Sequence, residues 1–172
     1  MNEQQSTGAS ANLGGEITIE LVAGRHPNGE LIVERLLVNP QQQPNSYQLL
    51  KSPVFVRGIA RADIVQSMEK PRGAFKVLQH GGNLCVRVFA KAGLDELEQL
   101  LTPKLEKLGG DLDVKDKSAL IYSIHVSCGF EAIEKILNEN VPTGSAAWFY
   151  GNVYDPETGE PLDWWQSILA PE

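Results

Sequence analysis

A chain of 172 residues, 42% hydrophobic and 22% charged, is long enough for one large or two small domains without a stabilising disulfide or metal. The formal charge of −7 at pH 7 disfavours a nucleic-acid-binding protein, because such proteins need a basic face. The same charge is compatible with a basic protein partner and equally with solubility alone.

The first half of the chain alternates in hydrophobicity with the period of β-strands. Residues 1–15 lack an apolar pattern and are expected to form a disordered tail. A hairpin is predicted over residues 16–38, because alternating residues flank the turn sequence His26-Pro27-Asn28-Gly29. Further strands are expected at 47–51, 54–57 and 64–67, and a second hairpin at 75–79 and 84–89. Residues 16–82 are thus predicted to be a β-rich subdomain, either a meander or a partial barrel.

The second half changes to helical spacing between residues 94 and 108, where Thr102-Pro103 is either a kink or a fresh start. The elements expected after it are an edge strand at 112–117, a central strand at 120–126, a helix capped by Ser127 and a last strand at 146–154. This order predicts a ferredoxin-like βαββαβ sandwich over 83–155, followed by a C-terminal tail, 156–172. The expected fold class is α+β, with the β-rich half packed on the sandwich.

One face of the predicted sandwich collects polar side chains. If alternate residues of its two central strands face the helices, Cys85, Arg87, Ser123 and His125 share the opposite face. These four residues could hold an anionic ligand or activate Cys85 as a nucleophile. Alternatively, the first half covers this face and the four residues satisfy one another at the seam. Cys128 begins a helix, where thiols become more reactive, although a free cysteine commonly just packs.

The remaining charged and ligating residues give weaker signals. Arg57, Arg61 and Arg72 could bind a phosphate or a carboxylate, or could pair with the abundant acids. The three histidines and two cysteines lack the spacing of a metal site, so we expect neither a metal nor a cofactor. Two cysteines also favour a reducing compartment, and no apolar run reaches the about 18 residues that span a bilayer. Because residues 1–15 do not resemble a secretory signal, a cytoplasmic protein outside the membrane is expected.

Aromatic and acidic residues concentrate near the C-terminus. Aromatic side chains are enriched at binding hot spots, and acids that rim them would suit a protein-docking surface. Alternatively, the tail folds back, the tryptophans complete the core, and the acids lie in a solvated turn. The candidate protein-binding residues are Trp148, Tyr150, Tyr154, Asp155, Glu157, Glu160, Asp163, Trp164 and Trp165.

The segment from Ser52 to Val65 (SPVFVRGIARADIV) carries a family resemblance. Its proline-aromatic strand, its Gly58-Ile59 corner and its step through Asp63 resemble an uncharacterised bacterial family catalogued as domain of unknown function 4265. Later motifs that match are Gly81-Gly82, Arg87-Val88-Phe89, Leu108-Gly109 and Gly144 through Trp148 to Tyr150. The likeness covers about residues 30 to 152 and departs at Ala62, where glycine is usual. It implies a small cytosolic bacterial protein and carries over no catalytic residue.

These observations favour a non-catalytic protein-binding module, such as an immunity or antitoxin-type inhibitor of a basic partner. A small-molecule-binding regulatory domain that uses Arg87 and His125 is the first alternative. A cysteine-dependent enzyme is the second.

Overall fold

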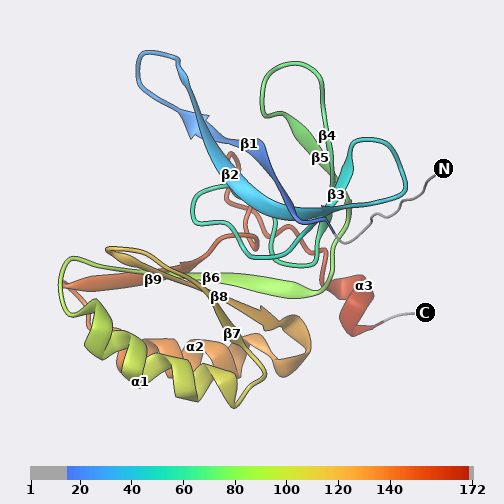
Figure 1. Ribbon diagram of the computed structural model, residues 1–172. Coiled ribbons are helices and arrows are strands. Elements are labelled where there is room, and N and C mark those ends of the chain that lie inside the picture. Colours follow the sequence, from blue (N-terminus) through green and yellow to red (C-terminus); the bar gives the residue numbers. More distant parts are fainter. Residues whose placement is uncertain (1–14, 171–172) are drawn as a thin grey trace.

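The computed structural model describes residues 15–170 and contains two antiparallel sheets with helices beneath one of them (Figure 1). The mixed α+β fold is confirmed. The first half forms β1 (Ile17–Arg25), β2 (Leu31–Pro40), β3 (Ser46–Leu49), β4 (Ile64–Ser67) and β5 (Phe75–Gln79). The second half forms β6 (Asn83–Ala90), α1 (Leu94–Glu106), β7 (Asp111–Lys115), β8 (Ala119–His125), α2 (Phe130–Asn140), β9 (Ala146–Tyr150) and α3 (Gln166–Leu169). The predicted tail lies outside the described residues, apart from Gly15.

The five strands of the first half pair in chain order, β1-β2-β3-β4-β5, and form an antiparallel meander. In the described part of the chain β1 and β5 are both edges, so the strand ladder does not close into a barrel. The Val22 N–H does donate to the carbonyl oxygen of Gly73 at 2.8 Å, which brings the two ends of the curled sheet together. The core of this half contains Leu21, Leu36, Val38, Leu49, Val56, Ile59 and Val65.

The strand predicted at 54–57 is wrong, because these residues form an irregular loop. The Glu34 carboxylate accepts hydrogen bonds from the backbone N–H groups of three consecutive loop residues, Val54, Phe55 and Val56, at 2.7 to 2.9 Å. A side chain of β2 therefore satisfies donors that a neighbouring strand would otherwise bind. Segment 52–60 is consequently tied to the first sheet without joining it.

The hairpin predicted from 75–79 and 84–89 is also wrong. β5 pairs with β4, whereas β6 pairs with β8 and β9 in the other sheet. The connecting glycines bond outside the expected turn: the Gly81 N–H donates to Asp63, and the Gly82 carbonyl accepts from the Val126 N–H. The chain therefore crosses from one sheet to the other at residues 80–82.

The second sheet has the order β7-β8-β6-β9, with every neighbouring pair antiparallel. As predicted, the strand over 120–126 is central and the charged strand over 112–117 is at an edge. Both long helices cover the same face of this sheet, and the five-stranded sheet lies over the opposite face (Figure 1). The helix-facing core includes Leu84, Val86, Val88, Leu101, Leu105, Tyr122, Ile124, Ile133 and Leu137.

The structure settles whether the first long helix is interrupted at Pro103 and corrects the predicted cap of the second. α1 runs through Pro103 as one helix, and the preceding Thr102 hydroxyl shares a 2.7 Å hydrogen bond with the Tyr122 hydroxyl on β8. The helix cap predicted at Ser127 is wrong, because Ser127 lies in a short 3-10 turn and Gly129 precedes α2. No helix among residues 15–170 is long and apolar enough to cross a membrane.

Candidate functional site

The predicted polar face exists, and three of its four residues meet there. Cys85, Arg87 and Ser123 point away from the helices and are buried under segment 52–60 of the first half. The Cys85 thiol donates to the Pro53 carbonyl at 3.6 Å, and the Ser123 hydroxyl shares a 2.6 Å hydrogen bond with Ser52. The first half thus covers the face, and it also supplies partners that these residues were expected to find among themselves.

His125 does not join this cluster. It is exposed at the end of β8, and its Nδ1 atom bonds the hydroxyl and the backbone N–H of Ser127. His125 also packs against the backbone of Gly82, since a Cβ atom there would lie 2.5 Å from its Nε2 atom. The prediction that all four side chains converge is therefore wrong for His125.

Burial suppresses the reactivity of both cysteines. Desolvation raises the pKa of the Cys85 thiol, although the neighbouring Arg87 guanidinium partly opposes the shift. Desolvation likewise raises the pKa of the half-buried Cys128 thiol. The nucleophilic form of cysteine is the thiolate, and the raised pKa of each thiol disfavours that form near neutral pH. This environment weighs against a cysteine-dependent enzyme.

We expect Cys85 to resist alkylation in the native protein at pH 7 and to react when the chain unfolds. The raised pKa removes the thiolate, and full burial excludes the reagent. Mass spectrometry after iodoacetamide treatment of a Cys128→Ser variant would follow Cys85 alone. Labelling of the native variant as fast as in denaturant would contradict this expectation.

Arg87 is the unusual residue of the buried face. Its side chain is only 3% exposed, and two of its nitrogens donate to main-chain carbonyls of the covering loop, those of Phe55 (3.4 Å) and Val56. Its Nε atom has no hydrogen-bond partner within residues 15–170. Among residues 15–170 no carboxylate lies within ion-pair distance of this guanidinium. A buried cation normally has an anionic partner, so Arg87 has unused capacity for one.

Gly151 explains how the guanidinium fits beneath the chain. A Cβ atom at this position would lie 2.7 Å from both Cζ and Nε of Arg87. The Gly151 backbone is itself fixed, because its N–H donates to Cys85 and its carbonyl accepts from the Gly58 N–H, at 2.8 and 2.9 Å. Glycine therefore lets the chain after β9 pass directly over Arg87.

Arg87 opens onto a cavity between the two halves, which we name the Arg87 groove. It has a volume of about 460 Å³, within the range of small-molecule sites. A second cavity of about 170 Å³ adjoins it and shares Arg57, Arg87 and Phe149 with it. The rings of Phe89 and Phe149 stack at 5.4 Å along the wall, 20° from parallel. The groove is lined by Ala23, Ile32, Val54, Phe55, Arg57, Arg87, Phe89 and Phe149.

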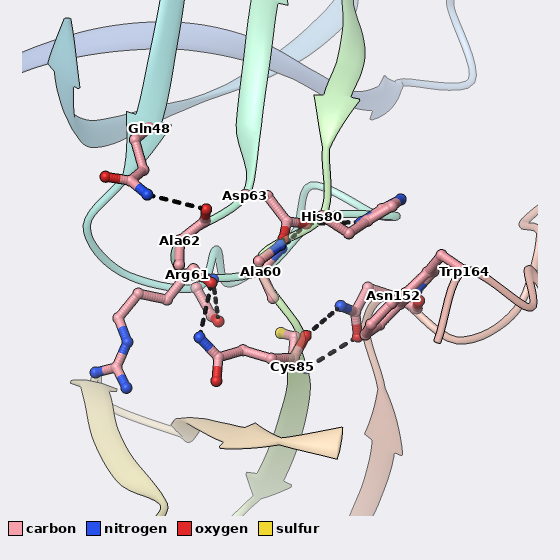
Figure 2. A network of polar contacts seen from close by, with 12 residues as sticks. Gln48, Ala60, Arg61, Ala62, Asp63, His80, Cys85, Asn152 and Trp164 are labelled. Carbon is pink, nitrogen blue, oxygen red and sulfur yellow. Dashed lines mark hydrogen bonds and ion pairs between the residues drawn. The ribbon is translucent and has the colours of Figure 1, made fainter. Parts of the chain in front are cut away.

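A polar network ties the crossing at residues 80–82 to both sheets (Figure 2). The fully buried Asp63 accepts from the N–H groups of Ala60 (3.0 Å) and Gly81 (2.7 Å). Its Oδ2 atom also lies 3.1 Å from Nδ1 of His80, whose ring stacks on Trp164 at 4.9 Å. The Asp63–His80 pair therefore binds the backbone at Ala60 and Gly81 and contacts Trp164 of the C-terminal tail. In the described residues no nucleophilic side chain forms a hydrogen bond with this pair.

Asn152 continues this network into the second sheet. Its Oδ1 atom accepts from the Cys85 N–H and its Nδ2 group donates to the Asn83 carbonyl, both at 2.9 Å. The Trp164 indole donates to the Asn152 carbonyl at 2.8 Å. These bonds fix the start of β6, which carries Cys85, to the segment after β9 and to the C-terminal tail.

The predicted aromatic and acidic surface separates into two groups. Trp148, Tyr150, Trp164 and Trp165 pack against the helix-facing core, as the alternative of a tail that folds back expects. Tyr154 remains 53% exposed at the edge of the smaller cavity. Asp155 accepts from the N–H groups of Glu157 and Thr158, which lowers the pKa of its carboxyl. Glu157, Glu160 and Asp163 are exposed in the same turn region.

Sequence reasoning missed most of the groove. Arg57 was one of three ambiguous arginines, and nothing in the spacing of Ala23, Ile32 or Phe55 connects them with Arg87. The strand alternation that assigns Arg87 to the face away from the helices assigns Phe89 to the same face. This alternation is the one feature of the sequence that predicts a second residue of the groove wall. The remaining walls depend on how the halves pack.

The fold and the groove define a two-sheet α+β protein with a buried arginine between its sheets, which has no ion-pair partner within residues 15–170. The family model of DUF4265, a domain of unknown function, matches residues 34–148, so the chain belongs to this family and the predicted resemblance is confirmed. A crystal structure of a hypothetical protein from Neisseria gonorrhoeae is similar in fold, with a TM-score of 0.63 and 15% identity. The match covers 81% of this chain and 96% of that chain. No curated protein matches the chain.

Proposed function

We propose that this protein is a non-catalytic binding module that holds a small organic anion in the Arg87 groove. The observation that carries the proposal is the burial of Arg87 without a carboxylate partner. An anionic ligand would supply the missing charge and accept hydrogen bonds from a guanidinium that is already oriented by two carbonyls. Arg57 adds a second positive charge at the same cavity.

The absence of a free nucleophile in the groove favours binding over catalysis. The two serine hydroxyls of the buried face, those of Ser52 and Ser123, bond each other, and Ser123 also donates to Asp113. The Cys85 thiol is protonated because burial raises its pKa. No group of three or more potential metal ligands gathers anywhere in residues 15–170. A regulatory or carrier role fits these side chains best.

Protein binding is the second candidate, because aromatic rings are exposed around the groove. Phe55 is 55% exposed and Phe149 is 46% exposed, and both line the groove; Phe149 also lines the smaller cavity together with Tyr154. Exposed apolar rings of this kind suit a docking surface. The inhibitor of a basic partner belongs to this candidate, and the charge of −7 is its support. The two arginines at the groove favour an anionic ligand instead.

The same proposal includes the ferredoxin-like description of the second half. Its support is the order β7-β8-β6-β9, the antiparallel pairing throughout, and the position of α1 and α2 on one face. In such a sandwich the open sheet face is a natural place for a ligand. Here the five-stranded sheet converts that face into a groove.

A thermal-shift screen of the purified full chain tests the function. We expect organic acids to raise Tm and their neutral amides to leave it unchanged, because only the acids provide a counter-ion for Arg87. Arg87→Gln and the exposed Arg57→Gln should each reduce the shift. Arg35→Gln is the matched control, since Arg35 is exposed and alternates to the face of β2 opposite Ile32.

The screen also has outcomes that overturn the proposal. Equal stabilisation by acids and amides would show that the charge of the ligand does not matter and would contradict pairing with Arg87. An unchanged response in both Arg57→Gln and Arg87→Gln would place the ligand elsewhere. The exposed position of Arg57 keeps the test valid if Arg87→Gln folds poorly.

A further inference from the structure

We infer that the Arg87 groove selects an aromatic monocarboxylate, with its ring on the Phe89–Phe149 stack and its carboxylate against Arg87 and Arg57. This inference rests on the proposed function and adds the chemical class of the ligand. Three observations carry it: the donors left on Arg87, the charges around them, and the shape of the apolar wall.

The donors suit a planar oxyanion. A guanidinium presents five N–H groups in a fixed plane, a geometry that matches the two oxygens of a carboxylate. The loop carbonyls of Phe55 and Val56 accept from one N–H on each terminal nitrogen of Arg87. Each terminal nitrogen keeps a second N–H, and Arg57 stands at the junction of the two cavities. A single carboxylate at this junction can therefore contact both arginines.

The charges disfavour a doubly negative head group. Asp155 lines the smaller cavity with Arg57 and Arg87. Two backbone N–H groups, those of Glu157 and Thr158, bond its carboxylate at 2.8 and 3.1 Å and keep it ionised near neutral pH. Two arginines opposed by one aspartate leave room for about one further negative charge. A monocarboxylate meets this requirement better than a phosphate monoester.

The apolar wall is flat and incomplete. Phe89 and Phe149 already stack nearly parallel, and ring stacking contributes more than the buried area alone. Phe149 still exposes 46% of its surface and Phe55 exposes 55%. Ile32, Ala23 and Val54 supply the rest of the lining without a charged group. A planar ring would extend the stack and cover rings that are now in contact with water.

Isothermal titration of the full chain with four matched probes tests the inference. The probes are 2-naphthoate, 2-naphthamide, 2-naphthyl phosphate and decalin-2-carboxylate. All four are bicyclic, and each of the last three differs from 2-naphthoate either in its head group or in the saturation of its rings. We expect 2-naphthoate to bind at least about tenfold more tightly than the neutral amide, because the amide leaves Arg87 unpaired. We expect it to bind about three- to tenfold more tightly than the saturated decalin acid, which cannot stack.

Two variants assign the preferences to side chains. Phe149→Leu should remove the preference for naphthoate over the decalin acid while leaving the preference for acid over amide. Arg57→Gln should reduce the preference for acid over amide, since Arg87 alone then pairs with the carboxylate, while leaving the preference for naphthoate over the decalin acid. Arg35→Gln should change neither ratio, since it lies away from the groove.

The outcomes distinguish a failure of this inference from a failure of the proposed function. Equal binding of naphthoate and the decalin acid would overturn the aromatic preference and keep the organic-anion site. Tightest binding of naphthyl phosphate would overturn the monocarboxylate. Equal binding of naphthoate and naphthamide would show that the charge of the ligand does not matter and would overturn both the inference and the proposed function. No binding of any of these bicyclic acids would overturn the inference alone, because the thermal-shift screen tests the proposed site with other organic anions.

Discussion

Replacing Asp63 with alanine is expected to lower the free energy of unfolding by about 3 kcal/mol or more, at about 1.5 to 3 kcal/mol for each of the two backbone N–H groups that loses a carboxylate acceptor. Asp63 is fully buried, and its carboxylate accepts from the N–H groups of Ala60 and Gly81 as well as contacting His80. Alanine would leave the buried N–H group of Ala60 and the part-buried N–H group of Gly81 without their acceptor. Urea denaturation followed by circular dichroism would measure the loss.

Asp116→Ala is the control for this prediction. Asp116 is exposed and accepts from the N–H group of the adjacent Lys117, so its removal should change the free energy of unfolding by no more than about 0.5 kcal/mol. A loss below about 1 kcal/mol for Asp63→Ala would show that the donors find other partners. The crossing between the sheets would then be less dependent on Asp63 than its contacts indicate.

Asp113→Ala is expected to cost about 3 kcal/mol, because it removes the acceptor at the centre of the seam between the sheets. The Asp113 carboxylate accepts from the Ser52 N–H at 2.8 Å, from the Ser123 hydroxyl, and from Arg61 at 3.1 Å. Its loss would leave Ser52 and Arg61 with buried or half-buried donors. The same urea titration would measure the effect.

Asp111 provides a close comparison for Asp113, since both carboxylates bond the same arginine. Arg61 lies 2.7 Å from Asp111, whose side chain is 56% exposed. An exposed ion pair contributes little, so Asp111→Ala should cost no more than about 1 kcal/mol. Equal losses in the free energy of unfolding for Asp111→Ala and Asp113→Ala would mean that burial of the carboxylate does not determine its contribution to stability.

The part of the fold that the sequence predicts is the part governed by local periodicity. The alternation in β6 and β8 places Cys85, Arg87 and Ser123 on the face away from the helices, as the structure shows. The leucines of α1 bury one stripe at helical spacing, with Leu94, Leu97, Leu101 and Leu105 all buried. Period two and period 3.6 are properties of neighbouring residues, so a single sequence carries them.

The parts that the sequence does not predict depend on contacts between distant residues. Residues 54–57 have strand-like composition, yet the Glu34 carboxylate, about twenty positions earlier, takes their N–H groups. The apparent hairpin around residues 80–82 fails because Asp63 and Val126 bind its glycines. His125 has the right parity for the polar face but lies at the end of its strand. No local pattern reports such partners.

The location of the groove couples ligand occupancy to the integrity of the whole chain. Ala23 and Ile32 belong to one sheet, Phe89 and Phe149 to the other, and the intervening loop supplies Val54 and Phe55. Neither sheet alone can form these walls, so any species in which one sheet has melted is unable to bind. An anion bound as proposed would therefore stabilise the chain against partial unfolding as strongly as against complete unfolding, and the two sheets should then melt as one cooperative unit.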